Sequence, residues 1–269
     1  RVLVGDPCYP TYFPCVYFAE GKPVSIPLTP EHGFLPPVDS LREMVERWQP
    51  AGILLNYPNN PTGAVSPLSF FQQLVKLARE KGLWVIQDNA YSEIYFGSPA
   101  PSILQVEGAK ECAVELFSFS KMLNMTGWRL GWICGNREML RALYVIKTNT
   151  DSGVFNPIQF AGIRALEVCE KILPDLRQEY KRRKEYVLNQ YRKMGLKPYD
   201  PAGTFYIWTP LPDGETHSLE FVLRILRSCN VLLSPGSGYG TYGEGYFRTS
   251  LTQPMEKIEE ALERFQHAL

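Results

Sequence analysis

Short apolar runs alternate with helical patterns along the first part of this 269-residue chain. The runs 53–56, 83–87 and 113–117 have the length and composition of buried strands. Between the first two, apolar side chains recur at helical spacing over 68–82, and Ser66 is predicted to cap that helix. Strands separated by helices are typical of a mostly parallel sheet, so we expect a three-layer αβα fold.

Three polar residues follow the ends of predicted strands. Asn60, Asp88 and Lys121 each come just after a different apolar run. In parallel sheets, ligands bind outside the carboxyl ends of the strands. We therefore expect these three side chains to meet at one rim.

The second half of the chain has a different pattern. A long, charge-dense helix is predicted over 158–194, with Pro174 as a potential interruption. We expect a large domain over 1–164 and a smaller α+β domain over 165–269. The other elements predicted for this smaller domain are strands over 204–208, 231–233 and 246–251 and helices over 217–228 and from 255.

Composition excludes several classes of function. Lys plus Arg equals Asp plus Glu at 28 each, so no basic excess favours nucleic acid or a membrane surface. No apolar run approaches the roughly 20 residues that span a bilayer. The six scattered cysteines form no CxxC pair and the three histidines share no ligand spacing. We therefore expect a cytoplasmic protein with reduced thiols and no metal site.

Lys121 carries the most specific chemistry. It follows an apolar run directly, with Ser118 and Ser120 before it and Arg129 eight residues later. The amine can form a Schiff base with an aldehyde, while the hydroxyls and the guanidinium can hold a phosphate. The alternative is an ordinary surface lysine.

Asp88 ends an apolar strand, where a carboxylate is costly without a partner. A protonated pyridine nitrogen would be such a partner, and the alternative is an aspartate that caps a loop. Tyr91 and the Asn60 amide can hydrogen-bond a phenolic oxygen of the same ring. Their alternatives are a packed aromatic and a turn over 59–63.

Arg248 lies in the predicted strand 246–251 among mostly apolar residues. Its guanidinium can grip a substrate carboxylate in a bidentate fork. The alternative is an arginine that faces solvent on an alternating strand.

Four motifs together resemble the class I/II aminotransferases of PLP fold type I, over essentially the whole chain. They are Asn-Asn-Pro-Thr-Gly (59–63), Asp-Asn-Ala-Tyr (88–91), Ser-Phe-Ser-Lys with Asn-Met-Thr-Gly-Trp-Arg-Leu-Gly-Trp (118–132), and Phe-Arg-Thr-Ser-Leu (247–251). Three further stretches look most like LL-diaminopimelate aminotransferases: 201–206, 234–239 and 243–248.

The resemblance implies pyridoxal 5′-phosphate (PLP) as cofactor and a homodimer acting on an amino acid and a 2-oxo acid. It makes Lys121 the Schiff-base lysine and Asp88 the partner of the ring nitrogen. The other implied roles are Asn60 and Tyr91 on the ring hydroxyl, Ser118, Ser120 and Arg129 on the phosphate, Arg248 on the α-carboxylate, and Tyr9 stacked on the ring with Tyr12 as a weaker candidate.

Family members carry roughly 100 residues before the segment that resembles Arg1, including a loop that binds the PLP phosphate. Their absence here suggests a fragment or a natural truncation. The leading hypothesis is amino-group transfer to 2-oxoglutarate in a ping-pong cycle. The alternatives are a PLP-dependent lyase or decarboxylase, an effector-binding domain of a transcription regulator, and an inactive remnant.

Overall fold

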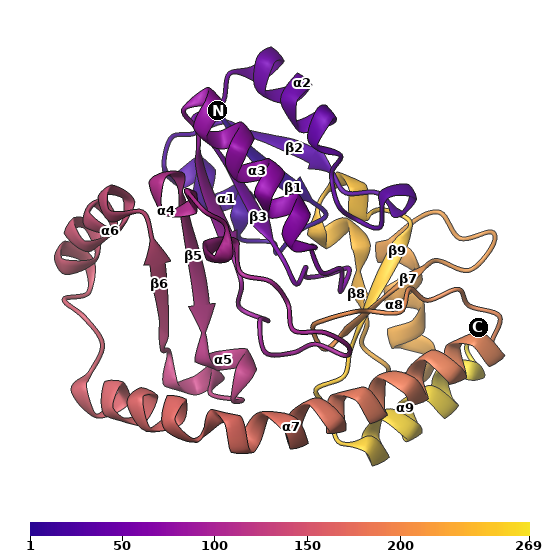
Figure 1. Cartoon of the computed structure of the whole chain (residues 1–269). Helices are drawn as coiled ribbons and strands as arrows, with labels where there is room; N and C mark the ends of the chain where they lie inside the picture. The colour runs from indigo at the N-terminus through magenta and orange to yellow at the C-terminus, as the bar shows by residue number, and fades with distance from the viewer.

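The computed structural model describes residues 1–269 and contains two sheets (Figure 1). The larger sheet has the strand order β2-β1-β3-β4-β5-β6. All neighbours are parallel except β6, which runs antiparallel to β5. Its strands are β1 Val2–Asp6, β2 Pro23–Pro27, β3 Gly52–Asn56, β4 Trp84–Asp88, β5 Ala113–Ser118 and β6 Gly131–Gly135. The predicted mostly parallel sheet is confirmed.

Helices cover both faces of this sheet (Figure 1). Leu3 and Ile53 belong to a core shared with α2 and α3, whereas Val4 and Leu54 pack with α1 on the other face. Alternate strand residues point to opposite faces, so a strand buried on both sides reads as a continuous apolar run. The helices are α1 Tyr12–Phe18, α2 Val38–Trp48, α3 Leu68–Lys81, α4 Ala109–Cys112, α5 Phe119–Met122, α6 Arg137–Thr150, α7 Asn156–Lys193, α8 Ser218–Cys229 and α9 Met255–Gln266.

The smaller sheet is antiparallel, with the order β7-β9-β8. It comprises β7 Tyr206–Pro210, β8 Ser234–Pro235 and β9 Tyr246–Ser250. The strand predicted over 231–233 is wrong, because only residues 234–235 pair with β9 and Leu232 faces solvent. α7 crosses the boundary proposed between residues 164 and 165, and that division stays a prediction.

The long helix α7 is continuous through Pro174 (Figure 1). The interruption considered at Pro174 is therefore absent. A proline inside a helix removes one backbone hydrogen bond. Leu173 and Tyr180 are both buried in cores on either side of this point, and their packing holds the helix together.

The start of α3 differs from the prediction by one residue. Pro67 has an extended backbone and the helix begins at Leu68. The Ser66 hydroxyl donates to the Pro67 carbonyl at 3.1 Å and does not cap the helix. Gly82 ends the helix in the left-handed conformation at φ 66°, as its position after the apolar pattern predicts.

None of the helices combines the length and the apolar character that crossing a bilayer requires.

Candidate active site

The carboxyl ends of β3, β4 and β5 lie level with one another. Asn56 pairs with Asp88, and Asp88 pairs with Leu116. The segments after these strand ends carry Asn60, Asp88 and Lys121. The register therefore brings all three segments to the same edge of the sheet.

The Asp88 carboxylate has only neutral hydrogen-bond donors. Tyr12 donates its hydroxyl to Oδ2 at 2.5 Å, and the Ala90 amide donates to Oδ1 at 3.0 Å. Burial raises the pKa of Asp88, and the hydrogen bonds from Tyr12 and Ala90 and the charge of Lys121 offset part of that rise. A cation beside this carboxylate would favour its ionised form.

Arg248 and Asn60 are 188 positions apart in sequence and in direct contact. Arg248 Nη1 donates to Asn60 Oδ1 at 2.8 Å, and Nη2 donates to Ser234 Oγ at 3.4 Å. The Arg248 Nε is buried and has no partner. Buried donors in native proteins are nearly always satisfied, so this nitrogen points to a missing acceptor.

Two tyrosine rings hold the Arg248 guanidinium in place. Its carbon lies 3.8 Å from the ring centre of Tyr206 and 4.8 Å from that of Tyr239. The Tyr91 hydroxyl donates to the Tyr206 hydroxyl at 3.3 Å. Burial and then neighbouring Tyr206 keep the pKa of Tyr91 well above its usual value, so its hydroxyl keeps its proton at neutral pH.

Lys121 lines a cavity of about 410 Å³ together with Ser120, Tyr206 and Arg248. The cavity lies between the end of β5 and the smaller sheet. It places an amine, a hydroxyl and a guanidinium around one space. Such a set suits a substrate or cofactor that carries negative charge.

Three other predicted residues lie apart from this cavity. Ser118 Oγ accepts from the Ser120 amide at 3.1 Å and caps the short helix α5. Arg129 is exposed, and its Nη1 donates to the Thr126 carbonyl at 2.8 Å. Tyr9 is 45% exposed, and its ring meets that of Tyr12 edge-on at 5.8 Å.

Two site residues were not assigned these roles by sequence reasoning. Tyr12 is buried and donates a hydrogen bond to Asp88, whereas the resemblance made it only a weaker candidate for stacking on the ring. Tyr206 lies beneath Arg248 and beside Tyr91. The signals for Tyr206 are its place in the predicted strand 204–208 and at the end of the stretch 201–206, and neither of them indicates a contact with Arg248.

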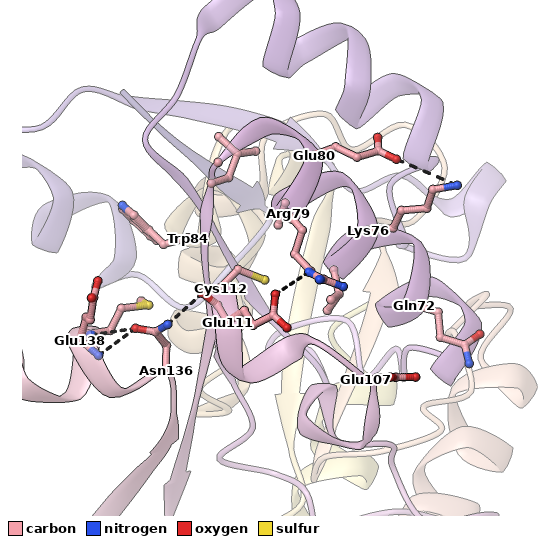
Figure 2. Close-up of a pocket in the computed structure, with 15 residues that line it drawn as sticks. Gln72, Lys76, Arg79, Glu80, Trp84, Glu107, Glu111, Cys112, Asn136 and Glu138 are labelled. Atoms are coloured by element: carbon pink, nitrogen blue, oxygen red, sulfur yellow. Dashed lines mark hydrogen bonds and ion pairs between the residues drawn. The ribbon is translucent and has the colours of Figure 1, made fainter.

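A larger cavity of about 830 Å³ lies at the opposite end of the sheet, between α3, α4 and the start of α6 (Figure 2). Several of its polar groups are paired. Arg79 pairs with Glu111 at 2.8 Å and Lys76 with Glu80 at 4.0 Å. Asn136 caps α6 and donates to the Glu111 carbonyl at 2.8 Å. Its paired charges offer little to a ligand.

The chain matches known proteins along its whole length. The sequence profile of the family "Aminotransferase class I and II" matches residues 1–265. The chain is 46% identical over 267 residues to the LL-diaminopimelate aminotransferase of Aquifex aeolicus, covering 99% of this chain and 68% of that protein.

Solved structures agree with the sequence matches. Substrate-bound BacF from Bacillus subtilis superposes with a TM-score of 0.95 at 32% identity, covering 99% of this chain and 68% of that one. A probable N-succinyldiaminopimelate aminotransferase from Thermus thermophilus has a TM-score of 0.92 at 36% identity, covering 100% of this chain and 72% of that one.

Proposed function

This chain belongs to the class I and II aminotransferases, and we propose that it moves an amino group from an amino acid such as LL-diaminopimelate to 2-oxoglutarate. The observation that carries the choice of donor is the 46% identity to the Aquifex protein over 99% of this chain. The family works with PLP.

The residues at the rim fit PLP. Asp88 is a carboxylate with only neutral donors, and Arg248 has a buried unpaired Nε. When bound, PLP supplies an electron sink for the α carbon of the substrate. Asp88 would keep a proton on the ring nitrogen. Burial strengthens that pairing, because opposite charges attract more strongly where the dielectric is low.

Lys121 Nζ would hold the PLP aldehyde carbon. With the substrate amine in that place, the free Lys121 Nζ would accept the proton from the substrate's α carbon. The cavity that Lys121 shares with Arg248 supports this role, since the substrate's α carbon and α-carboxylate are neighbours. An amine held on a short helix after a rigid strand is positioned for both tasks.

Asn60, Tyr91 and Tyr9 would hold the ring. Tyr91 keeps its proton and would donate a hydrogen bond to the ring hydroxyl in exchange for its bond to Tyr206. Asn60 is buried and its Oδ1 receives a hydrogen bond from Arg248, which leaves its amide NH₂ to donate. Tyr9 is exposed on one side and free to stack.

Ser118, Ser120 and Arg129 would bind the phosphate. Ser120 lines the Lys121 cavity, and Ser118 lies two residues away. Arg129 would exchange its hydrogen bond to the Thr126 carbonyl for phosphate oxygens. That exchange is favourable, because a guanidinium binds an anion more strongly than a neutral carbonyl.

Arg248 would bind the α-carboxylate of the substrate. Its stack on Tyr206 and its bonds to Asn60 and Ser234 orient the guanidinium before the substrate arrives. The unpaired Nε is the donor that a carboxylate oxygen would satisfy. Pre-orientation reduces the entropy that binding costs.

The protein would act as a homodimer in the cytoplasm. The helix α6 buries none of its residues, although several are large and apolar, and most residues in the first part of α7 are also not buried. The exposed side chains are Leu143, Tyr144, Val145, Ile146, Phe155, Phe160, Ile163 and Leu166. Apolar patches of this kind mark protein interfaces. The six free cysteines support a reducing compartment.

Absorption spectroscopy tests the function directly. The purified protein should develop a visible band after PLP is added, and LL-diaminopimelate should shift the band and release a 2-oxo acid. Release of ammonia with pyruvate, or of carbon dioxide, would instead identify a lyase or a decarboxylase. For the dimer, light scattering should give twice the chain mass for the wild type and one chain mass for Ile146→Lys.

A further inference from the structure

Glu115 is a buried carboxylate that the proposed reaction does not use. It lies in the middle of β5 and has no solvent exposure. Burying a carboxylate costs free energy unless its oxygens are hydrogen-bonded. Glu115 comes three residues before Ser118 and six residues before Lys121. It is therefore further from the carboxyl end of β5 than the proposed cofactor site.

Three neutral donors from two other segments satisfy this carboxylate. Asn89 Nδ2 donates to Oε1 at 2.9 Å, and the Ile103 amide donates to the same oxygen at 3.3 Å. The Ser102 hydroxyl donates to Oε2. Burial raises the pKa of Glu115, and the bonds from Ser102, Ile103 and Asn89 counteract that rise. One side chain therefore ties both ends of the 89–103 loop to β5.

Backbone hydrogen bonding between β4 and β5 continues one residue beyond the last residue pair of the two strands. Asp88 pairs with Leu116, and the backbone N–H of Asn89 donates to the Leu116 carbonyl at 2.8 Å. Asn89 directly follows Asp88, so its bond to Glu115 fixes the chain where the Asp88 side chain projects. Tyr12 holds the Asp88 carboxylate itself.

We propose that Glu115 is a positioning residue that fixes the spacing between Asp88 and the segment 118–121. This inference rests on the proposed PLP site, whose ring nitrogen meets Asp88 while its aldehyde meets Lys121. A rigid cofactor bridges these two groups only when their separation is correct, and errors of about 0.5 Å degrade such sites. β5 carries the lysine, and Glu115 holds the Asp88 loop to β5.

Glu115→Ala should raise the dissociation constant for PLP about 10- to 100-fold, the range seen when hydrogen-bonded partners of metal ligands are removed. The pH at which the visible band of the PLP-loaded protein titrates should also shift. Glu115→Gln should stay within about 3-fold of the wild type, because its amide oxygen still accepts from Asn89 and Ile103. A glutamine variant as weak as the alanine variant would overturn a role in positioning.

Val75→Ala is the matched control. Val75, on α3, is buried in the core that also contains Ile103, and its side chain makes no hydrogen bond to the rim. It should lower the melting temperature while PLP affinity stays within about 2-fold, as expected for a cavity away from the site. Equal loss of PLP affinity in Val75→Ala and Glu115→Ala would reduce the effect to general destabilisation and overturn the inference.

Asn89→Ala removes the hydrogen bond between Asn89 and Glu115 by deleting its donor. It replaces Glu115→Ala as the test variant if Glu115→Ala does not fold. It should weaken PLP binding about 10-fold, and wild-type affinity would contradict the inference. Hydrogen exchange tests the clamp in PLP-free protein: the backbone amide of residue 89 should exchange faster in Glu115→Ala or, where that variant fails to fold, in Asn89→Ala than in Val75→Ala. Unchanged exchange overturns the clamp, whereas a wild type that binds no PLP contradicts the proposed function.

Discussion

The two ends of the large sheet differ in how their polar groups are satisfied. The larger cavity, about 830 Å³ at the amino end, is lined by two ion pairs, Arg79 with Glu111 and Lys76 with Glu80. The smaller one, about 410 Å³ at the carboxyl end, is lined by Lys121 and Arg248, and the Arg248 Nε has no partner. The proposed site is therefore at the end of the sheet with the unpaired Arg248 Nε and not at the end with the larger cavity.

Lys121 should give the largest effect. Lys121→Ala removes the amine that holds PLP and moves the proton, so amino transfer should fall about 10⁴-fold or more. The visible band of bound PLP should disappear. Lys76→Ala, in the amino-end cavity, should keep both the band and the rate. An unchanged visible band in Lys121→Ala would refute the assignment of the site.

Arg248 should give the next largest effect. Arg248→Lys keeps the charge but loses the planar fork and the stack on Tyr206. The kcat/KM for the amino acid should fall about 100-fold, mostly through KM, since truncating a buried charge pair costs roughly 2–5 kcal/mol. Arg79→Lys is the control and should remain within about 2-fold. Equal effects of Arg248→Lys and Arg79→Lys on kcat/KM would contradict the proposal that only the carboxyl-end cavity takes part in the reaction.

Asp88 should lower the stability of the PLP-free protein at neutral pH although the proposed reaction needs it. Its folded-state pKa is raised by burial, so the stability it contributes is fully present below its unfolded pKa of about 4 and is lost as pH rises through the folded pKa. Asp88→Asn avoids that loss. The PLP-free variant should therefore be more stable than the wild type at pH 7.5 by roughly 0.5–2 kcal/mol, and the gain should shrink toward pH 4.

Denaturant unfolding at the two pH values measures this gain. Asp88→Asn should also lower kcat/KM about 100-fold, because a neutral amide does not keep a proton on the ring nitrogen. Glu111→Gln, on the exposed surface of the other cavity, should stay within about 0.5 kcal/mol at both pH values. An Asp88→Asn protein less stable than the wild type at pH 7.5 would contradict the electrostatic argument.

Local patterns predicted the rim but not the contacts across it. Strand ends can be read from short apolar runs, and parallel topology then brings Asn60, Asp88 and Lys121 to one edge. The bond from Tyr12 to Asp88 joins residues 76 positions apart and depends on how α1 packs. Single-sequence periodicity carries no information about such a pair.

The elements at the sheet edge were also missed. The strand β6, Gly131–Gly135, begins and ends with glycine and lies within a motif that attracted a functional interpretation. The helix α6 has a one-sided apolar pattern comparable to that of the core-facing helix α3, yet it buries no residue. The pattern indicates a helix but does not show what its apolar side chains pack against.

Arg79 should give the smallest effect. Arg79→Met breaks the ion pair with Glu111, whose side chains are 48% and 61% exposed, so stability should fall by only about 0–1 kcal/mol. Because Arg79 and Glu111 neutralise each other, the amino-end cavity should contribute nothing to the reaction, and kcat/KM should stay within about 2-fold. Steady-state kinetics at matched PLP content would check this. A 10-fold loss would show that this cavity is coupled to the carboxyl rim, and pairing of charges would then no longer separate an inert cavity from a working one.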